Sequence, residues 1–368
     1  MPYLLANFSI AVLIATTYTL RSIMSGNLVP MPEQSSKSGN EDRGVSLIDN
    51  SDQEPAEKPQ DTTSTGDHTA VAPRQDQAKP SLFDLVRNTK DFNEHKRAIQ
   101  QAISDAIVNS EIGHQYNVLF LYDDYDSINR FTANEIYSAV TSATHDRNKA
   151  LLLIVFSNGG SIEPAYLISK SCKKTSSKFV VAVPRFAKSA ATLIALGADE
   201  IHMGMISELG PIDPQVGQYP ALGLGFALDY IAGVCKKYPQ TATMFSEYLS
   251  AKLDLRDLGY LERVSKSAVQ YAERLLANRE LPEDQTPASV AHKFVYEYKD
   301  HGFVIDVDEA TETLGRALVR TGTPEYHLAN EIHDLLSPLE LAYNFFHQKR
   351  FKILGRHETG MYIWDLKN

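Results

Sequence analysis

Two strand-to-helix junctions carry the residues best suited to chemistry. The first, SNGGSIEPA, places Gly159 and Gly160 between an apolar run and a helical pattern. Glycine lets the backbone turn tightly, and the N–H groups at a helix start have no partner inside the helix and bind anions. These groups could form an oxyanion hole, which needs fixed donors around developing negative charge. A simple tight turn would use the same two glycines.

The second junction, FAKSAATLIALGA, places Ser189 at the start of the next helical pattern. Serine is common as an N-cap, where it only satisfies helix N–H groups. Alternatively, Ser189 is a nucleophile, because a helix N-terminus favours an oxyanion and the N–H of Ala190 would lie beside it. Ligands of α/β sheets bind outside the carboxyl ends of the strands, so two such junctions in successive units favour the nucleophile.

A serine nucleophile needs a general base. Lys188 directly precedes the serine, and neighbouring side chains point in different directions, so we interpret it as a structural or orienting residue. Lys252, His301 and Asp213 are candidates for the base or its partner. A lysine base must be buried to lose its proton near neutral pH, whereas histidine titrates there without help.

The elements around these junctions alternate between strand and helix. Apolar runs predict strands over 117–124, 149–160, 178–185 and 199–203. Helical patterns separate them, and helices dominate beyond about residue 215. Continuous apolar strands that alternate with helices indicate a parallel sheet covered on both faces, so the fold class is α/β with a helical C-terminal region.

The N-terminal part has a different composition. Residues 1–24 include nineteen consecutive uncharged residues, Pro2–Leu20. This segment could be a transmembrane anchor or a signal segment, or the start of translation could be misread. If residues 3–20 span a membrane, the basic residues that follow favour a cytoplasmic main domain; the alternative is a soluble cytoplasmic protein. Residues 25–80 are rich in Ser, Asp, Glu, Gln and Pro, which predicts a disordered linker.

Several motifs of the chain resemble, in the same order, those of the serine dehydrogenase proteinase family. They are FSNGGSIEPAYLISK, VPRFAKSAATLIALGADEIHMG and SELGPIDPQ, followed by SAVQYAERLL and YKDHGFVIDVDEA. This family is a branch of the ClpP/crotonase-like superfamily, which also contains Clp-type proteases and signal peptide peptidase A. The resemblance covers roughly residues 115 to 315. It implies a ClpP/crotonase-like ββα spiral core, a serine protease domain over 81–320 and a C-terminal helical extension over 321–368.

The resemblance also implies roles for individual residues. Ser189 matches the nucleophile, Gly159 and Gly160 match the glycines of the oxyanion hole, and Ala190 matches its second contributor. In Clp-type subunits a histidine follows the serine by about one βα unit, but here Asp213 falls near that place. A Ser-His-Asp triad in that order is therefore not supported.

The base is consequently less well defined by the resemblance. Signal peptide peptidase A uses a Ser-Lys dyad, and on that analogy Lys252 is the first candidate for the base and His301 the second. The implied function is that of a serine-type endopeptidase, membrane-associated, which cleaves peptide or protein substrates.

Two functions of other classes remain open. A crotonase-type enzyme would use the same N–H donors to stabilise the enolate of an acyl-thioester, without a covalent serine. A non-catalytic scaffold or adaptor would keep the fold and use Ser189 only as a helix cap. The serine at the nucleophile position favours the peptidase over the thioester enzyme.

Composition limits the partners that we expect. The formal net charge is −10 over 368 residues, and no basic cluster is interleaved with aromatic residues, which argues against nucleic acid. The histidines lack metal-binding spacing, and no GxGxxG motif follows a strand, so we expect neither a metal nor another cofactor. Relatives in the superfamily form rings or trimers, so a homo-oligomer is expected.

Overall fold

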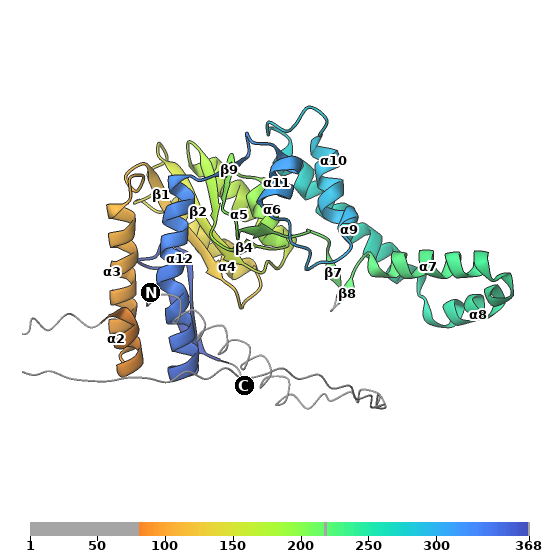
Figure 1. Ribbon diagram of the computed structural model, residues 1–368, viewed down its shortest axis with the longest axis horizontal. Coiled ribbons are helices and arrows are strands. Elements are labelled where there is room, and N and C mark those ends of the chain that lie inside the picture. The colour runs from red at the N-terminus through yellow and green to blue at the C-terminus, as the bar shows by residue number, and fades with distance from the viewer. Residues whose placement is uncertain (1–80, 217–218, 367–368) are drawn as a thin grey trace, which may run out of the picture. The chain divides into compact units, whose positions relative to one another are not determined.

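A central sheet runs through the computed structural model (Figure 1). Its strands, in chain order, are β1 (Tyr116–Asp123), β2 (Ala150–Ser157), β3 (Phe179–Val183), β4 (Phe186–Ala187), β5 (Glu200–Met203), β6 (Glu208–Leu209), β9 (Val319–Thr321), β10 (Lys349–Gly355) and β11 (Met361–Asp365). The main path has the order β11-β10-β1-β2-β3-β5-β9, and β4 pairs with β2 and β6 beside it. A separate ribbon consists of β7 (Gln215–Val216) and β8 (Tyr219–Pro220).

The structure describes residues 81–216 and 219–366. The predicted anchor or signal segment, 1–24, and the predicted linker, 25–80, lie outside the described residues. Within the described part of the chain, no helix combines the length and the apolar character needed to cross a membrane.

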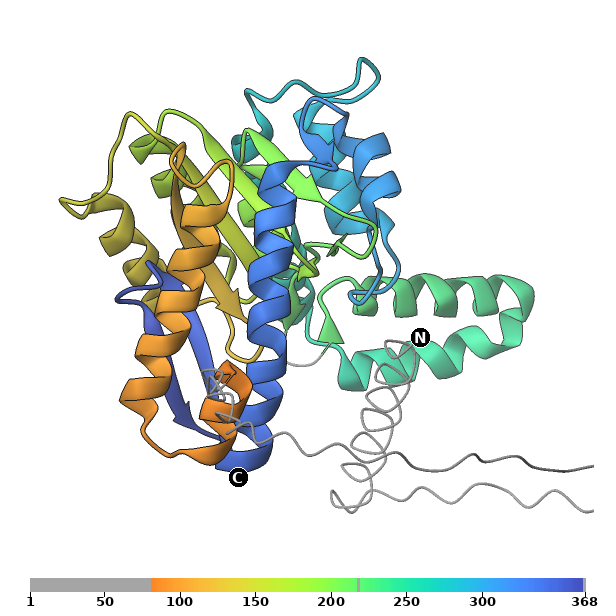
Figure 2. The same ribbon diagram turned by 60° about the vertical axis from the view of Figure 1, so that its left-hand side comes forward.

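Helices cover both faces of the sheet, and one pair, Gly223–Lys237 and Ala242–Lys252, projects away from it (Figures 1 and 2). They are α2 (Leu82–Asn88), α3 (Phe92–Asn109), α4 (Arg130–Thr141), α5 (Ile162–Thr175), α6 (Ala190–Leu196), α7 (Gly223–Lys237), α8 (Ala242–Lys252), α9 (Leu255–Leu276), α10 (Pro287–His292), α11 (Val307–Leu314) and α12 (Pro324–Ala342). Parallel pairing joins strands β1, β2, β3, β5 and β9 in this order. Helices connect these strands along the chain. The predicted α/β class is therefore confirmed.

Alternate residues of each strand enter two separate cores. In β2, Leu151 and Leu153 pack in the core that contains α4, α5 and α6. Leu152 and Ile154 point to the other face, where the core contains α3 and α12. Because successive side chains of a strand point to opposite faces, a strand buried on both sides must be apolar throughout. This requirement explains the uninterrupted apolar runs in the sequence.

The C-terminal segment differs from the prediction of a helical extension over 321–368. Helix α12 packs directly on the sheet, within the second core. The chain then forms the antiparallel hairpin β10–β11, and β10 pairs with β1 in the register Leu121↔Leu354. Residues 349–365 are thus part of the central sheet, because their apolar side chains complete the face that α3 and α12 cover.

One buried histidine of α12 lets this packing be tested. His333 is 6% exposed, and its Nδ1 lies 3.0 Å from the hydroxyl oxygen of Tyr122. Burial, with a smaller effect of the Arg185 charge, lowers the pKa of His333 to about 4. A histidine in the unfolded chain has a pKa of about 6.5, so below that pH the unfolded state binds the proton first. The contribution of His333 to stability is therefore complete above about pH 6.5 and is lost as the pH falls toward 4.

We predict that His333→Gln makes the free energy of unfolding less dependent on pH in the acidic range. Between pH 7 and pH 4.5 the wild type should lose roughly 2–3 kcal/mol more than the variant, because each pKa unit corresponds to about 1.4 kcal/mol. Urea unfolding at the two pH values measures this difference, and the other buried histidines act equally in both proteins. Equal losses in both proteins would contradict the prediction.

Candidate active site

Ser189 occupies a strained turn between β4 and α6. Its backbone has φ 51° and ψ −119°, which is unfavourable for a residue with a side chain. The Ser189 side chain makes no capping hydrogen bond to the helix. Its position therefore differs from that of an ordinary N-cap, and it has the geometry of a nucleophile elbow, in which a sharp strand-to-helix turn exposes a serine hydroxyl.

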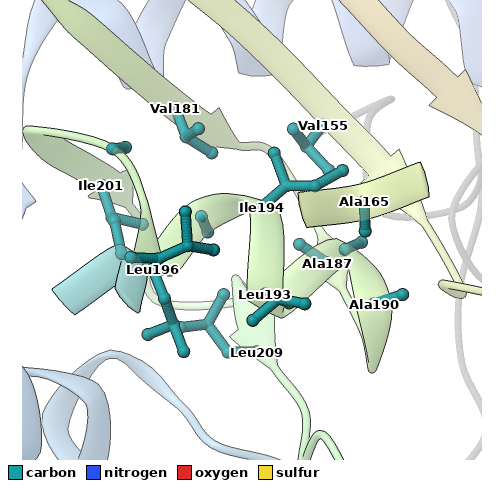
Figure 3. Close-up of a cluster of buried hydrophobic side chains, with 14 of the residues drawn as sticks. Val155, Ala165, Val181, Ala187, Ala190, Leu193, Ile194, Leu196, Ile201 and Leu209 are labelled. Carbon is teal, nitrogen blue, oxygen red and sulfur yellow. The ribbon is translucent and has the colours of Figure 1, made fainter. Parts of the chain in front are cut away.

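Buried contacts on the helix side fix this turn. All seven residues of α6 are buried, and Leu193, Ile194 and Leu196 pack among side chains of neighbouring strands (Figure 3). The Oγ1 of Thr192, also fully buried, lies 2.6 Å from the carbonyl oxygen of Ala187 and accepts a 3.0 Å hydrogen bond from the N–H of Gly210. The first turn of α6 is thus tied to the strands on both sides of it.

Lys188 supports the elbow from the other side. Its Nζ donates a 2.5 Å hydrogen bond to Glu208, and its backbone N–H donates to the carbonyl of Ser157 at 2.9 Å. The Lys188 side chain is therefore engaged in an ion pair. This geometry fits the structural or orienting interpretation of Lys188.

The glycine turn lies directly against the serine elbow. Gly159 and Gly160 have φ of 97° and 151°, a region that favours glycine. A Cβ on Gly159 would lie 2.5 Å from the carbonyl oxygen of Lys188 and 2.8 Å from the Cβ of Ser189. A Cβ on Gly160 would lie 2.3 Å from the backbone nitrogen of Ile128. Both positions therefore require glycine: a side chain on Gly159 would push the serine turn away, and one on Gly160 would clash with the backbone of Ile128.

Some backbone N–H groups of the two turns already donate a hydrogen bond, and others are free to bind an oxyanion. The N–H of Gly159 donates to the hydroxyl oxygen of Ser157 at 3.2 Å. Among the described residues, no acceptor receives a hydrogen bond from the N–H of Gly160 or Ala190. These two groups can therefore serve as oxyanion donors, whereas Gly159 contributes the close approach of the backbones.

A cleft of about 860 Å³ opens over the two turns. Ser189, Gly159 and Gly160 line it together with His301. Its other walls come from the loop after β1, from Ile212, Pro214 and Gln215, and from α9, which contributes Tyr260, Arg263, Val264, Ser267 and Tyr271. This cleft brings the serine and the histidine named from the sequence to one site.

His301 is held by a buried carboxylate. Its Nδ1 lies 2.7 Å from Oδ1 of Asp213, which is only 5% exposed. The Nε2 of Gln215 donates to the second carboxylate oxygen of Asp213 at 2.9 Å. When Nδ1 carries the proton toward Asp213, Nε2 of His301 is left as an acceptor, as a general base requires. No hydrogen bond joins His301 to Ser189, and such bonds often form only when substrate is bound.

Lys252 lies elsewhere. It is the last residue of α8, its side chain is exposed, and it does not line the cleft. Of the candidate bases, only His301 shares the cleft with Ser189.

One wall of the cleft is acidic. Asp124 follows β1, lines the cleft and is half-buried; burial, with the charge of Asp123 nearby, raises its pKa. Asp126 is instead neutralised by Lys352 at 2.6 Å and Arg350 at 3.3 Å, both from β10.

The acidic wall and the role of Gln215 were not predicted from the sequence. The signals were present, since Asp123 ends a buried strand, Asp124 follows it, and Gln215 lies two residues after Asp213.

Comparison with known proteins yields both sequence and structural matches. Two uncharacterized proteins of Methanocaldococcus jannaschii are each 42% identical to the chain, over 103 and 72 residues. These alignments cover 28% and 20% of this chain, and 35% and 25% of the relatives. The chain thus spans about a third or less of the curated relatives that it matches.

Among solved structures, the membrane-bound stomatin-specific protease 1510-N is 15% identical, with a TM-score of 0.35 over 61% of this chain and 82% of the other. An enoyl-CoA hydratase homologue from Streptomyces coelicolor is 11% identical, with a TM-score of 0.34 over 64% and 78%. The family described as ClpP-like SDH-type serine proteinase matches residues 97–230, a segment that contains Ser189 and both glycines of the turn. Over this segment the resemblance to the serine dehydrogenase proteinase family is therefore confirmed.

Proposed function

We propose that the protein is a serine endopeptidase with Ser189 as its nucleophile. The observation that carries this proposal is the strained elbow: Ser189 has a positive φ, makes no capping bond and faces a large cleft. A serine that only capped a helix would use its side chain for that purpose. Two N–H groups without acceptors, those of Gly160 and Ala190, lie in the adjoining turns.

The proposed reaction uses these groups in sequence. The Oγ of Ser189 attacks the peptide carbonyl, and Nε2 of His301 takes its proton. The negative charge that develops on the carbonyl oxygen is stabilised by the N–H groups of Gly160 and Ala190. His301 then returns the proton to the leaving amine, and a water molecule hydrolyses the acyl-enzyme by the reverse transfers.

Asp213 has a positioning role in this scheme. Its carboxylate would hold the His301 tautomer and stabilise the imidazolium that forms during the reaction. The order along the chain, Ser189, Asp213, His301, differs from that of Clp-type subunits. Catalytic triads are defined by geometry rather than by order, so this difference is no obstacle. Membrane attachment through residues 3–20 remains a prediction from the sequence.

Labelling with a fluorophosphonate probe tests the nucleophile. We expect the wild-type chain to be labelled and Ser189→Ala to lose labelling, because the probe requires an activated serine. Ser267→Ala is the matched control, since Ser267 lines the same cleft and should not be needed. A folded wild type without labelling would contradict the peptidase proposal and favour the scaffold. Labelling that persists in Ser189→Ala would contradict the assignment of Ser189 as the nucleophile.

A second pair of variants tests the base. His301→Gln should lower the rate of labelling and of casein hydrolysis by about 10²–10⁴-fold, the usual contribution of a general base. Lys252→Met should leave both rates within about twofold of the wild type, because that exposed side chain lies outside the cleft. The opposite ranking of the two variants would assign the base to Lys252.

The glycine turn provides a third test. Gly160→Ala would place a Cβ against Ile128, displace the backbone N–H of a residue that lines the cleft, and lower kcat by about 10²–10³-fold. Gly225→Ala is the control, because a Cβ there meets no atom within 4 Å. An unchanged kcat in Gly160→Ala would show that this N–H does not stabilise the oxyanion.

A further inference from the structure

One face of helix α9 forms a wall of the cleft that Ser189 also lines. This helix leads from the projecting hairpin back to the sheet (Figure 1). Its lining residues recur every three or four positions and are Tyr260, Arg263 or Val264, Ser267 and Tyr271. Residues at this spacing share one face of a helix, so their side chains line the cleft. This face is therefore part of the surface that a substrate meets.

The remainder of α9 is fixed to the protein core. Ala268 and Ala272 are fully buried in the core that contains α6. The ring of Tyr271 lies 4.8 Å from the ring of Tyr166 on α5, measured between centroids. Arg263 precedes Ala268 by five residues, which corresponds to about 7.5 Å along a helix axis. The Arg263 side chain thus projects from a part of the wall that is anchored close by.

Arg263 has no carboxylate partner within residues 81–216 and 219–366. Its guanidinium lies over the ring of Tyr260, with 5.6 Å between Cζ and the ring centroid. The neighbouring acid, Glu262, instead pairs with Lys266 at 3.1 Å. Arg263 is exposed, and an arginine stays protonated throughout the physiological pH range. The α9 wall therefore offers a permanent positive charge that no described acid neutralises.

The other charged groups of the cleft are mainly acidic. Asp124 and Asp126 line it from the loop after β1, and Glu163 lines it from the first turn of α5. Among the described residues that line the cleft, Arg263 is the one lysine or arginine. These acids repel a substrate carboxylate, whereas Arg263 attracts it. Arg263 is consequently the place in the cleft where a carboxylate is favoured.

We infer that Arg263 is a specificity-determining residue that binds a carboxylate of the peptide substrate. This inference rests on the proposed peptidase function of Ser189. The carboxylate belongs either to a Glu or Asp side chain or to the C-terminus of the peptide, because a guanidinium binds both through two parallel N–H···O hydrogen bonds. Tyr260 limits the positions of the guanidinium before substrate binds. The cleft would thus select acidic peptides and fix their register across Ser189.

Cleavage of matched peptides by the full chain tests the inference. The substrates are pairs of fluorescence-quenched decapeptides that differ only by Gln or Glu at one position, which is moved along the peptide. A further pair differs only by a C-terminal amide or carboxylate. We expect kcat/KM to be at least tenfold higher for one carboxylate-bearing peptide than for its neutral counterpart, and Arg263→Gln to remove this difference. The pair that shows the preference identifies the source of the carboxylate.

Two further variants make this test specific. Arg274→Gln is the matched control and should keep the preference of the wild type, because Arg274 is also exposed on α9 but does not line the cleft. Arg263→Glu should reverse the preference, so that the neutral peptide of the selected pair is cleaved faster. Equal cleavage within every pair by the wild type, or a preference that persists in Arg263→Gln, would overturn the inference.

Peptide binding separates a failure of this inference from a failure of the proposed function. Fluorescence anisotropy with the same peptides, on Ser189→Ala with and without Arg263→Gln, requires no turnover. Carboxylate-selective binding that depends on Arg263, in a protein that neither cleaves peptides nor reacts with fluorophosphonate, would support the carboxylate site and contradict the peptidase. A wild type that is labelled by fluorophosphonate but shows no carboxylate preference would support the peptidase and contradict the role of Arg263.

Discussion

The close approach of two backbone turns is the constraint on which the site depends. Gly159 lies so near to Ser189 that a single methyl group would not fit between the turns. The sheet sets this distance, because Ser157 at the end of β2 pairs with Ala187 at the end of β4. Two strand ends in register therefore place Ser189 and the glycine turn beside each other, and glycine is the residue that permits this approach.

The strain at Ser189 is balanced by an unusually complete set of buried contacts. Helix α6 has no exposed side, so it cannot rotate or shift to relieve the positive φ without opening the core. Thr192 and Lys188 fasten the same short helix to the strands before and after it. An unfavourable backbone angle persists only where its surroundings determine it this strongly, and such places are common in active sites.

The sequence predicted those parts of the molecule that depend on local patterns. The spacing of apolar residues predicted the strands and helices of the α/β core. The junctions around Gly159 and Ser189 were identified because the residue types that form a turn lie next to each other in the sequence. Strands β10 and β11 were missed because β10 pairs with β1, more than 200 positions earlier. No local pattern distinguishes such a strand from an apolar extension of the preceding helix.

The same reasoning explains the uncertainty about the base. His301 and Asp213 were each named from the sequence, but their contact joins residues 88 positions apart and becomes visible only in the fold. The analogy with signal peptide peptidase A made Lys252 the first candidate for the base. Lys252 ends a helix of the projecting hairpin, so its separation from Ser189 along the chain does not indicate how far apart the two residues lie in the fold.

Ion pairs connect the hairpin β10–β11 with the end of β1 and the loop that follows it. Lys352 on β10 reaches both Asp126 and Asp123, and 226 positions separate Asp126 from Lys352. Asp123 is 6% exposed, and a buried carboxylate that loses its cation is strongly destabilising. The strand that extends the sheet beyond β1 thus also supplies the counter-charge for Asp123 and Asp126. Burial raises the pKa of Asp123, and the Lys352 charge opposes this rise, so protonation of Asp123 and undocking of β10 favour each other.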